Sequence, residues 1–130
     1  MGRYFVGKLD EAAKTLIGEI RPALIATASK AGMPNVSAKG SFRILDDDHV
    51  AFNDMMSPRT TENLKENPQV SIIGLDSNRR SYRIWGTAEV LDSGPLYDEA
   101  AEAMAARNMK PKHVIRVTID EVAISVPAAK

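Results

Sequence analysis

Apolar side chains recur at helical spacing in one segment near the start of the chain, residues 9–20, and Pro22 ends this pattern. A second helix is predicted over residues 58–66, because Ser57 is a favourable N-cap and a proline takes the first helical position. A third helix is predicted over residues 96–107, which are rich in alanine and glutamate. The pattern therefore predicts three short helices, well separated along the chain.

Between these helices the pattern changes to alternating apolar and polar positions with many β-branched side chains, which predicts β-strands. In the last strand Val122 falls out of phase with the apolar positions before it, and a bulge near Asp120 and Glu121 would explain the change. The segments show no βαβ alternation, so we expect a mainly β fold, an antiparallel barrel with flanking helices. The six predicted strands cover residues 23–29, 35–45, 49–53, 70–75, 80–91 and 113–126.

The bulk composition is that of an ordinary globular protein, with 44% apolar and 26% charged residues among 130. The formal net charge is zero, so neither nucleic acid nor an anionic membrane is expected as a partner. The chain has no cysteine, which excludes disulfides and thiolate chemistry and is typical of a cytoplasmic protein. No segment has the pattern of a signal peptide or a membrane span. We therefore expect one soluble, cytoplasmic domain over residues 1–130.

The start of the second predicted helix, Ser57-Pro58-Arg59-Thr60, is a candidate anion-binding site. The backbone N–H groups of a first helical turn have no partner within the helix and point toward a bound anion. The Arg59 guanidinium and the two hydroxyl groups would add hydrogen bonds to a phosphate. The alternative is an ordinary N-cap with an exposed arginine, which is a commoner feature, and these four residues alone do not decide between the two.

The segment SAKGS at residues 37–41 lacks the large apolar side chains that a barrel strand usually carries. Gly40 within a strand marks either a bulge or the close approach of a ligand to the backbone. Lys39 is then either a surface charge or a donor to a carbonyl or phosphate group. Two other side chains also have two interpretations. Trp85 either packs in the core or a subunit interface, or provides a surface on which a ligand stacks. Met55 either fills a gap in the packing or contacts a flat ring system.

The sequence carries no recognisable catalytic or metal-binding motif. Neither His49 nor His113 has a partner at the spacing of a metal site, and the acidic triplet at residues 46–48 lacks the other ligands of a calcium loop. Glycine-rich nucleotide motifs and hydrolase motifs are also missing. We therefore expect no metal, and we expect a bound cofactor to supply any chemistry.

The run from residue 23 to residue 92 resembles the pyridoxamine 5′-phosphate oxidase-like family of flavin-binding split β-barrels, and it is most similar to their short members of FMN-binding-protein type. The resemblance rests on the order and spacing of ATASKAGMPNVSAKGSF, VAFNDMMSPRTTENLKENPQVSII and YRIWGTAEVLD. It implies a six-stranded antiparallel split β-barrel that forms a homodimer, with FMN bound in clefts between the two subunits. The residues that the resemblance implies in FMN binding are Ser37, Ala38, Lys39, Gly40, Asn53, Asp54, Met55, Ser57, Arg59, Thr60, Ser81 and Arg83.

The same resemblance implies a role for each group of residues. Residues 37–40 match the strand that runs along the isoalloxazine ring and the ribityl chain, and residues 53–55 match the end of the next strand, which lines the cofactor. Residues 57–60 match the phosphate-binding segment. Residues 81 and 83 occupy positions where related oxidases carry a glutamine and an arginine.

The chain also departs from the true pyridoxamine phosphate oxidases. It ends in VPAAK, without the arginine-rich, tryptophan-containing segment that helps those enzymes to bind pyridoxal phosphate, and it has Arg59-Thr60 where they have two successive basic residues. We therefore expect a small FMN-binding redox protein, a flavin reductase, an oxidase-like enzyme or an electron carrier, rather than an enzyme of vitamin B6 oxidation. Related branches of the fold bind a deazaflavin or haem. A deazaflavin-dependent reductase and a non-catalytic ligand-binding or sensing module are therefore the alternatives.

Overall fold

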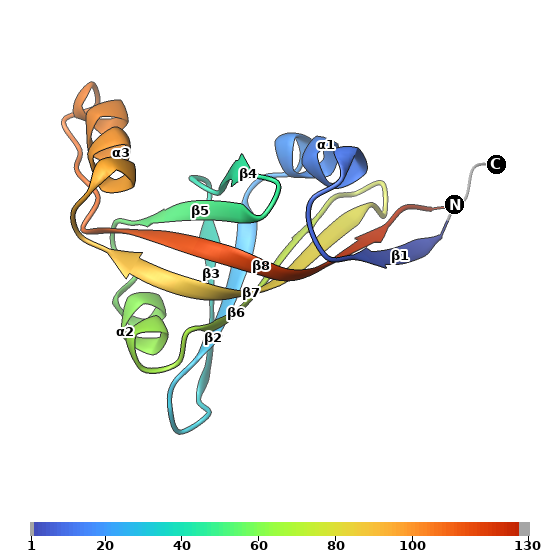
Figure 1. Cartoon of the computed structure of the whole chain (residues 1–130), viewed down its shortest axis with the longest axis horizontal. Coiled ribbons are helices and arrows are strands. Elements are labelled where there is room, and N and C mark those ends of the chain that lie inside the picture. The colour runs from blue at the N-terminus through green and yellow to red at the C-terminus, as the bar shows by residue number, and fades with distance from the viewer. Residues whose placement is uncertain (1, 128–130) are drawn as a thin grey trace.

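A curved antiparallel β-sheet with three flanking helices forms the fold (Figure 1). The computed structural model describes residues 2–127 of the chain. These residues form eight strands, which confirms the mainly β class, although the sequence pattern predicts six. In chain order the elements are β1 (Arg3–Val6), α1 (Glu11–Glu19), β2 (Ala23–Ala28), β3 (Pro34–Lys39), β4 (Arg43–Asp46), β5 (His49–Asp54), α2 (Pro58–Glu66), β6 (Gln69–Leu75), β7 (Ser81–Leu91), α3 (Pro95–Ala105) and β8 (His113–Ser125).

The two edge strands of the sheet are neighbours in the sequence. The strand order is β3-β2-β6-β7-β8-β5-β4, with β1 beside β8, and all of these pairs are antiparallel. β8 spans 13 residues, long enough to pair with β7 along one side and with β5 and then β1 along the other. Only residues 40–42 join the edge strands β3 and β4. The sheet must therefore curl until these edges approach each other, which is the geometry of a split barrel.

The prediction of one strand over residues 35–45 is wrong. This segment forms β3 and then β4, and the two strands pair with different partners, β3 with β2 and β4 with β5. The chain bends before Phe42, whose side chain is 3% exposed and stacks on Tyr82 with the ring centroids 6.0 Å apart. The Arg21 guanidinium donates hydrogen bonds to the carbonyl oxygens of Gly40 and Phe42 and so stabilises the bend. Burial of one aromatic ring in the barrel thus overrides the strand pattern.

β8 is flanked by a strand that the pattern misses and contains a bulge that the pattern predicts. β1 has only four residues and no fully buried side chain, so pairing with β8, rather than its own periodicity, makes it a strand. The bulge near Asp120 and Glu121 is confirmed, because the pairing with β7 shifts between Glu121 and Ile119 and leaves Asp120 without an opposite residue. A Cβ on Gly86 of β7 would lie 2.5 Å from the carbonyl oxygen of Thr118, so only glycine fits beside the bulge.

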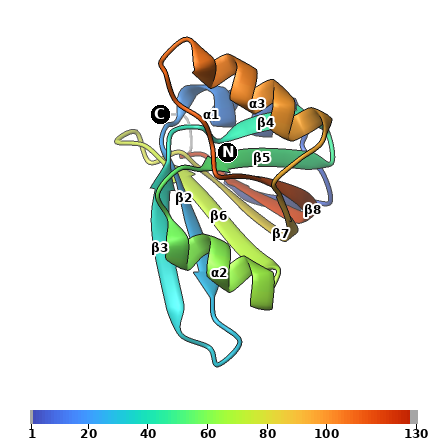
Figure 2. The ribbon, with the colours of Figure 1, turned by 90° about the vertical axis from the view of Figure 1, so that its left-hand side faces the viewer.

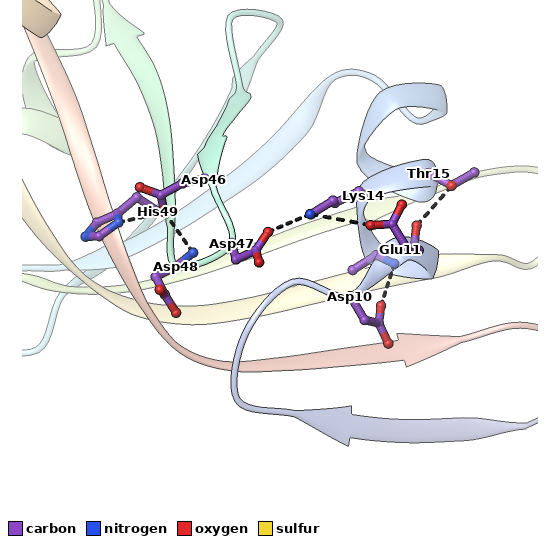
Figure 3. Close-up of polar contacts among 9 residues, drawn as sticks. Asp10, Glu11, Lys14, Thr15, Asp46, Asp47, Asp48 and His49 are labelled. Carbon is purple, nitrogen blue, oxygen red and sulfur yellow. Dashed lines mark hydrogen bonds and ion pairs between the residues drawn. The ribbon is translucent and has the colours of Figure 1, made fainter.

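An ion pair and a backbone hydrogen bond connect the start of α1 to the turn between β4 and β5 (Figure 3). Asp10 accepts a hydrogen bond from the backbone N–H of Ala13 at 2.8 Å and caps α1. The Lys14 ammonium lies 2.5 Å from the Asp47 carboxylate, and the backbone N–H of Leu9 donates to the Asp47 carbonyl oxygen. The acidic triplet is therefore a turn that anchors α1.

α2 and α3 lie at the same end of the molecule, on opposite sides of the sheet (Figures 1 and 2). α2 packs against β2, β3 and β7, and it begins and ends at the predicted residues 58 and 66. α3 lies on the opposite side, above β4 and β5 in Figure 2. The last residues of β5 therefore lie between the two helices. No helix within residues 2–127 has the length and apolar character needed to cross a bilayer.

Candidate functional site

Hydroxyl and amide side chains join β3 to the start of α2. Ser37 Oγ lies 2.9 Å from Thr60 Oγ1, and Asn35 Nδ2 donates to the same Thr60 oxygen over 3.3 Å. Thr60 is 1% exposed, so its hydroxyl serves this contact rather than open solvent. The alternation of β3 places Asn35, Ser37 and Lys39 on the side of the strand that faces α2. These contacts fix the position of the helix start.

Ser57 occupies the N-cap position of α2, but its side chain does not cap the helix. The Ser57 hydroxyl accepts a hydrogen bond from the Lys39 ammonium instead, and the Ser57 backbone N–H donates to Asp54 Oδ1 over 2.9 Å. The first-turn N–H groups of Arg59 and Thr60 therefore donate no hydrogen bond to the N-cap side chain. The ordinary N-cap interpretation thus lacks its defining hydrogen bond, and the helix start is open to an external anion.

Asp54 is the buried acid of this region, with a side chain that is 4% exposed. Its Oδ2 atom accepts a hydrogen bond from the Thr61 hydroxyl at 2.5 Å and lies 3.1 Å from His113 Nδ1. Burial by itself would raise the pKa of Asp54. The hydrogen bonds from Thr61, the Ser57 backbone and His113, together with the Lys39 charge, outweigh burial and hold the pKa below its usual value. Asp54 is therefore charged at neutral pH.

Lys39 is the buried cation of the same cluster and is 7% exposed. Burial lowers the pKa of Lys39, and the nearby Asp54 carboxylate opposes this effect. A lysine ammonium has three donors, and the Ser57 hydroxyl takes one of them. Lys39 thus places a desolvated positive charge next to the start of α2.

Arg59 lies exposed at a cavity of about 420 Å³ that Met33, Pro34, Asn35 and Asn63 also line. Its guanidinium forms no ion pair with a carboxylate of residues 2–127. A cavity of this size lies within the range of small-molecule sites. The uncapped first turn, the free guanidinium and the Lys39 charge together give a site that suits an anion.

Three other predicted residues lie beside this cluster but do not join it. Asn53 precedes Asp54 and therefore points to the other side of β5, where its Oδ1 accepts a hydrogen bond from Arg43 at 3.1 Å. Gly40 lies in the linker after β3, and a Cβ there would meet no atom within 4 Å, so open space adjoins the backbone. Met55 follows β5 in the loop before α2 and is half-buried.

Ala38, Ser81 and Arg83 lie on the outward face of the sheet. Ala38 on β3 pairs with Leu24 on β2, Leu24 with Ile73 on β6, and Ile73 with Arg83 on β7. Ala38 and Arg83 therefore lie on the same face of the sheet. The Arg83 guanidinium lies over the Trp85 ring, 5.6 Å from its centroid, and Ser81 shares a cavity of about 310 Å³ with both. A single chain therefore does not bring all the predicted cofactor residues together, because they are divided between two faces of the sheet.

Asn35, Thr61 and His113 contact predicted site residues, although the sequence does not predict them as site residues. Period-two alternation could have identified Asn35, which lies two residues before Ser37 on the same face of β3. His113 gave no such signal, since its partner Asp54 is 59 residues away. Only the pairing of β5 with β8 places these two residues opposite each other.

A sequence profile of the pyridoxamine 5′-phosphate oxidase family matches residues 9–125. The chain belongs to this family. An uncharacterized protein of Methanocaldococcus jannaschii is 34% identical in an alignment of 125 residues that covers 93% of this chain and 83% of that protein. These matches confirm the resemblance that the order of motifs indicates in the sequence.

Solved structures of similar proteins agree with this assignment. HupZ of Group A Streptococcus is 30% identical with a TM-score of 0.81, and the match covers 88% of this chain and 91% of HupZ. An FMN-binding protein from Syntrophomonas wolfei is 18% identical with a TM-score of 0.77 over 92% of this chain and 87% of that one. An F420 reductase is 18% identical with a TM-score of 0.64 over 90% of this chain and 98% of the reductase. The last two show the fold alone.

Proposed function

We propose that this chain is a cytoplasmic, FMN-binding redox protein that acts as a homodimer. The observation that carries the proposal is the start of α2, where the Ser57 side chain leaves the helix uncapped and Arg59, beside a cavity, forms no ion pair within residues 2–127. A phosphate at this place would accept hydrogen bonds from backbone N–H groups and from the Arg59 guanidinium. The FMN-binding protein of Syntrophomonas wolfei, which shares the fold, supports FMN as the cofactor.

The residues of the chain would bind and orient this cofactor. Arg59 and the first-turn N–H groups of α2 would hold the phosphate, and Lys39 would donate to a further oxygen. Asp54 would act indirectly, because it fixes the Ser57 backbone and the Thr61 hydroxyl and so keeps the helix start in its open geometry. Bound FMN would supply hydride or electron transfer, which no side chain of this site provides.

A homodimer is part of the proposal because Ala38, Ser81 and Arg83 face away from α2. In a dimer this outward face of one subunit could meet the α2 site of the other. The same face carries exposed apolar side chains, with Val36 65% and Leu75 58% exposed. Sedimentation equilibrium is expected to give a dimer, and Val36→Glu, which places a charge on this face, is expected to give a monomer. A monomeric wild type with bound FMN would contradict this part of the proposal.

The phosphate site is tested by Arg59→Ala. Loss of one charge-assisted contact is expected to weaken FMN binding about 10- to 100-fold, from roughly 1.5–3 kcal/mol per contact. The measurement is a titration of FMN fluorescence with the apoprotein. Arg79→Ala is the matched control, because it removes the same charge from the exposed β6–β7 turn, at the opposite end of the sheet from α2 (Figure 1). Equal FMN affinity of Arg59→Ala and the control would exclude this site.

The cofactor and its reaction need separate measurements. The absorption spectrum of the purified protein and the mass of the released cofactor distinguish FMN from a deazaflavin, the second candidate, which the fold shared with an F420 reductase supports. Reduction of the bound flavin by NAD(P)H, directly or through a reductase, is expected for a redox protein. A bound flavin that no such donor reduces would favour a ligand-binding or sensing module. A protein that stays colourless after incubation with FMN and gel filtration would refute FMN binding.

A further inference from the structure

A second cavity lies between α3 and the hairpin of β4 and β5, and none of the residues at the start of α2 lines it. Its volume is about 300 Å³, which is in the range of small-molecule sites. Figure 2 shows α3 above β4 and β5 on this side of the molecule. One wall is polar and the other is largely apolar. The polar wall consists of Ser41, Arg43 and Asn53, and the opposite wall on α3 includes Ala100, Ala103 and Met104.

The Arg43 guanidinium is the positive charge of this cavity, and only part of it is engaged. Its Nη1 atom donates to the Ser41 carbonyl oxygen and to Asn53 Oδ1, both over 3.1 Å. Its Nε and Nη2 atoms have no hydrogen-bond partner among residues 2–127, and no carboxylate of these residues forms an ion pair with it. Burial lowers the pKa of Arg43, and the charge of Glu99 on α3 opposes this effect. A partly desolvated cation with free donors is a favourable partner for an anion.

Asn53 holds this guanidinium in place. Asn53 is 6% exposed, and its backbone N–H donates to Ser41 Oγ over 2.9 Å. Its side-chain nitrogen contacts the Met104 sulfur of α3 over 3.4 Å, which turns the Asn53 carbonyl oxygen toward Arg43. The arginine is therefore oriented before any ligand arrives, so binding does not have to immobilise it.

The cavity exists because α3 presents small side chains to the sheet. Ala100 is the one buried residue of α3, and Ala103 contributes only a methyl group to the cavity wall. A leucine at either position would extend into this space. Glu99 also lines the cavity, and its charge disfavours a ligand with more than one negative group.

We propose that this cavity binds a small organic acid with a single carboxylate and a compact apolar body. The carboxylate pairs with the free donors of Arg43, and the apolar body lies against Ala100, Ala103 and Met104. The site is separate from the proposed FMN phosphate site, since no residue lines both cavities. Neither proposal depends on the other.

Benzoate and isovalerate are suitable probes, and benzamide is the neutral control that matches benzoate in shape. The measurement is an NMR titration of the purified protein, which follows the Arg43 Nε–H signal and the Met104 methyl signal. We expect saturable shifts of both signals with each acid and no such shifts with benzamide. Failure of both acids to bind, or equal binding of benzamide, would overturn the proposal.

Two variants test whether Arg43 and the space beside Ala103 bind the acid. Arg43→Met is expected to weaken benzoate binding at least about tenfold, because the charge-assisted contacts are lost. Ala103→Leu places a larger side chain in the cavity wall and keeps the charge of Arg43. Because Ala103 is exposed, this variant is expected to fold, so it tests the cavity even if Arg43→Met misfolds. It is also expected to weaken benzoate binding at least about tenfold, with the melting temperature unchanged. Wild-type benzoate affinity in Ala103→Leu would overturn the proposal.

Discussion

Replacing Asp54 with alanine removes the acceptor of the Ser57 backbone N–H, the Thr61 hydroxyl and the His113 ring. A hydrogen bond to a charged group is worth roughly 1.5–3 kcal/mol, and a buried donor left without a partner costs roughly 1–3 kcal/mol. Ser57 and His113 are only partly buried, so water can replace part of these contacts. We therefore expect Asp54→Ala to lower the free energy of unfolding by about 3 kcal/mol, and Asp54→Asn, which keeps one acceptor, by about half as much.

The pH dependence of this loss follows from the charge of Asp54. The pKa of this group lies below 3.8 in the folded protein and returns to 3.8 on unfolding, so the folded state favours the ionised form. Its stabilising effect is fully present above 3.8 and is lost as the pH falls through the lower, folded pKa. The difference in stability between wild type and Asp54→Asn is therefore expected to be constant near neutral pH and to shrink in strong acid.

Urea denaturation, followed by the fluorescence of Trp85, measures both effects. Asp48→Ala is the matched control, because Asp48 is an exposed acid in the β4–β5 turn and its carboxylate has no partner among residues 2–127. The control is expected to stay within about 0.5 kcal/mol of wild type. If Asp54→Ala were as stable as this control at neutral pH, the role of Asp54 as the organising acid would be refuted.

Three further substitutions test the packing of the barrel. Gly86→Ala is expected to cost about 2 kcal/mol or more, because its Cβ would lie 2.5 Å from the Thr118 carbonyl oxygen; a melting temperature equal to that of wild type would contradict this. Gly18→Ala in α1 meets no atom within 4 Å and is expected to add about 0.5–1 kcal/mol of stability by thermal denaturation, so a lower melting temperature would count against it. Phe42→Ala removes the ring that stacks on Tyr82 and is expected to cost about 3–5 kcal/mol in urea denaturation, whereas a loss typical of an exposed residue would show that the bend does not need the ring.

The sequence by itself determined the features that depend on neighbours along the chain. α2 covers the predicted residues 58–66, because its start and stop residues act within one turn. The bulge at Asp120 was predictable because a shift in the two-residue period is visible within one strand. The position of Arg59 at a helix start also follows from four consecutive residues, although the sequence could not show that Ser57 leaves the helix uncapped or that Arg59 has no ion-pair partner within residues 2–127.

Only the tertiary structure decided which side chains share a face and which partners they meet. Residues 35–45 alternate as one strand, but burial of Phe42 divides them and sends the two halves to opposite edges of the sheet. Asp54 meets His113 across 59 residues of chain, and no local pattern carries that pairing. The physical reason is that periodicity records which side chains alternate, whereas strand pairing and burial, which are long-range contacts, decide where each face points. The site at the start of α2 and the cavity at Arg43 both depend on these long-range contacts.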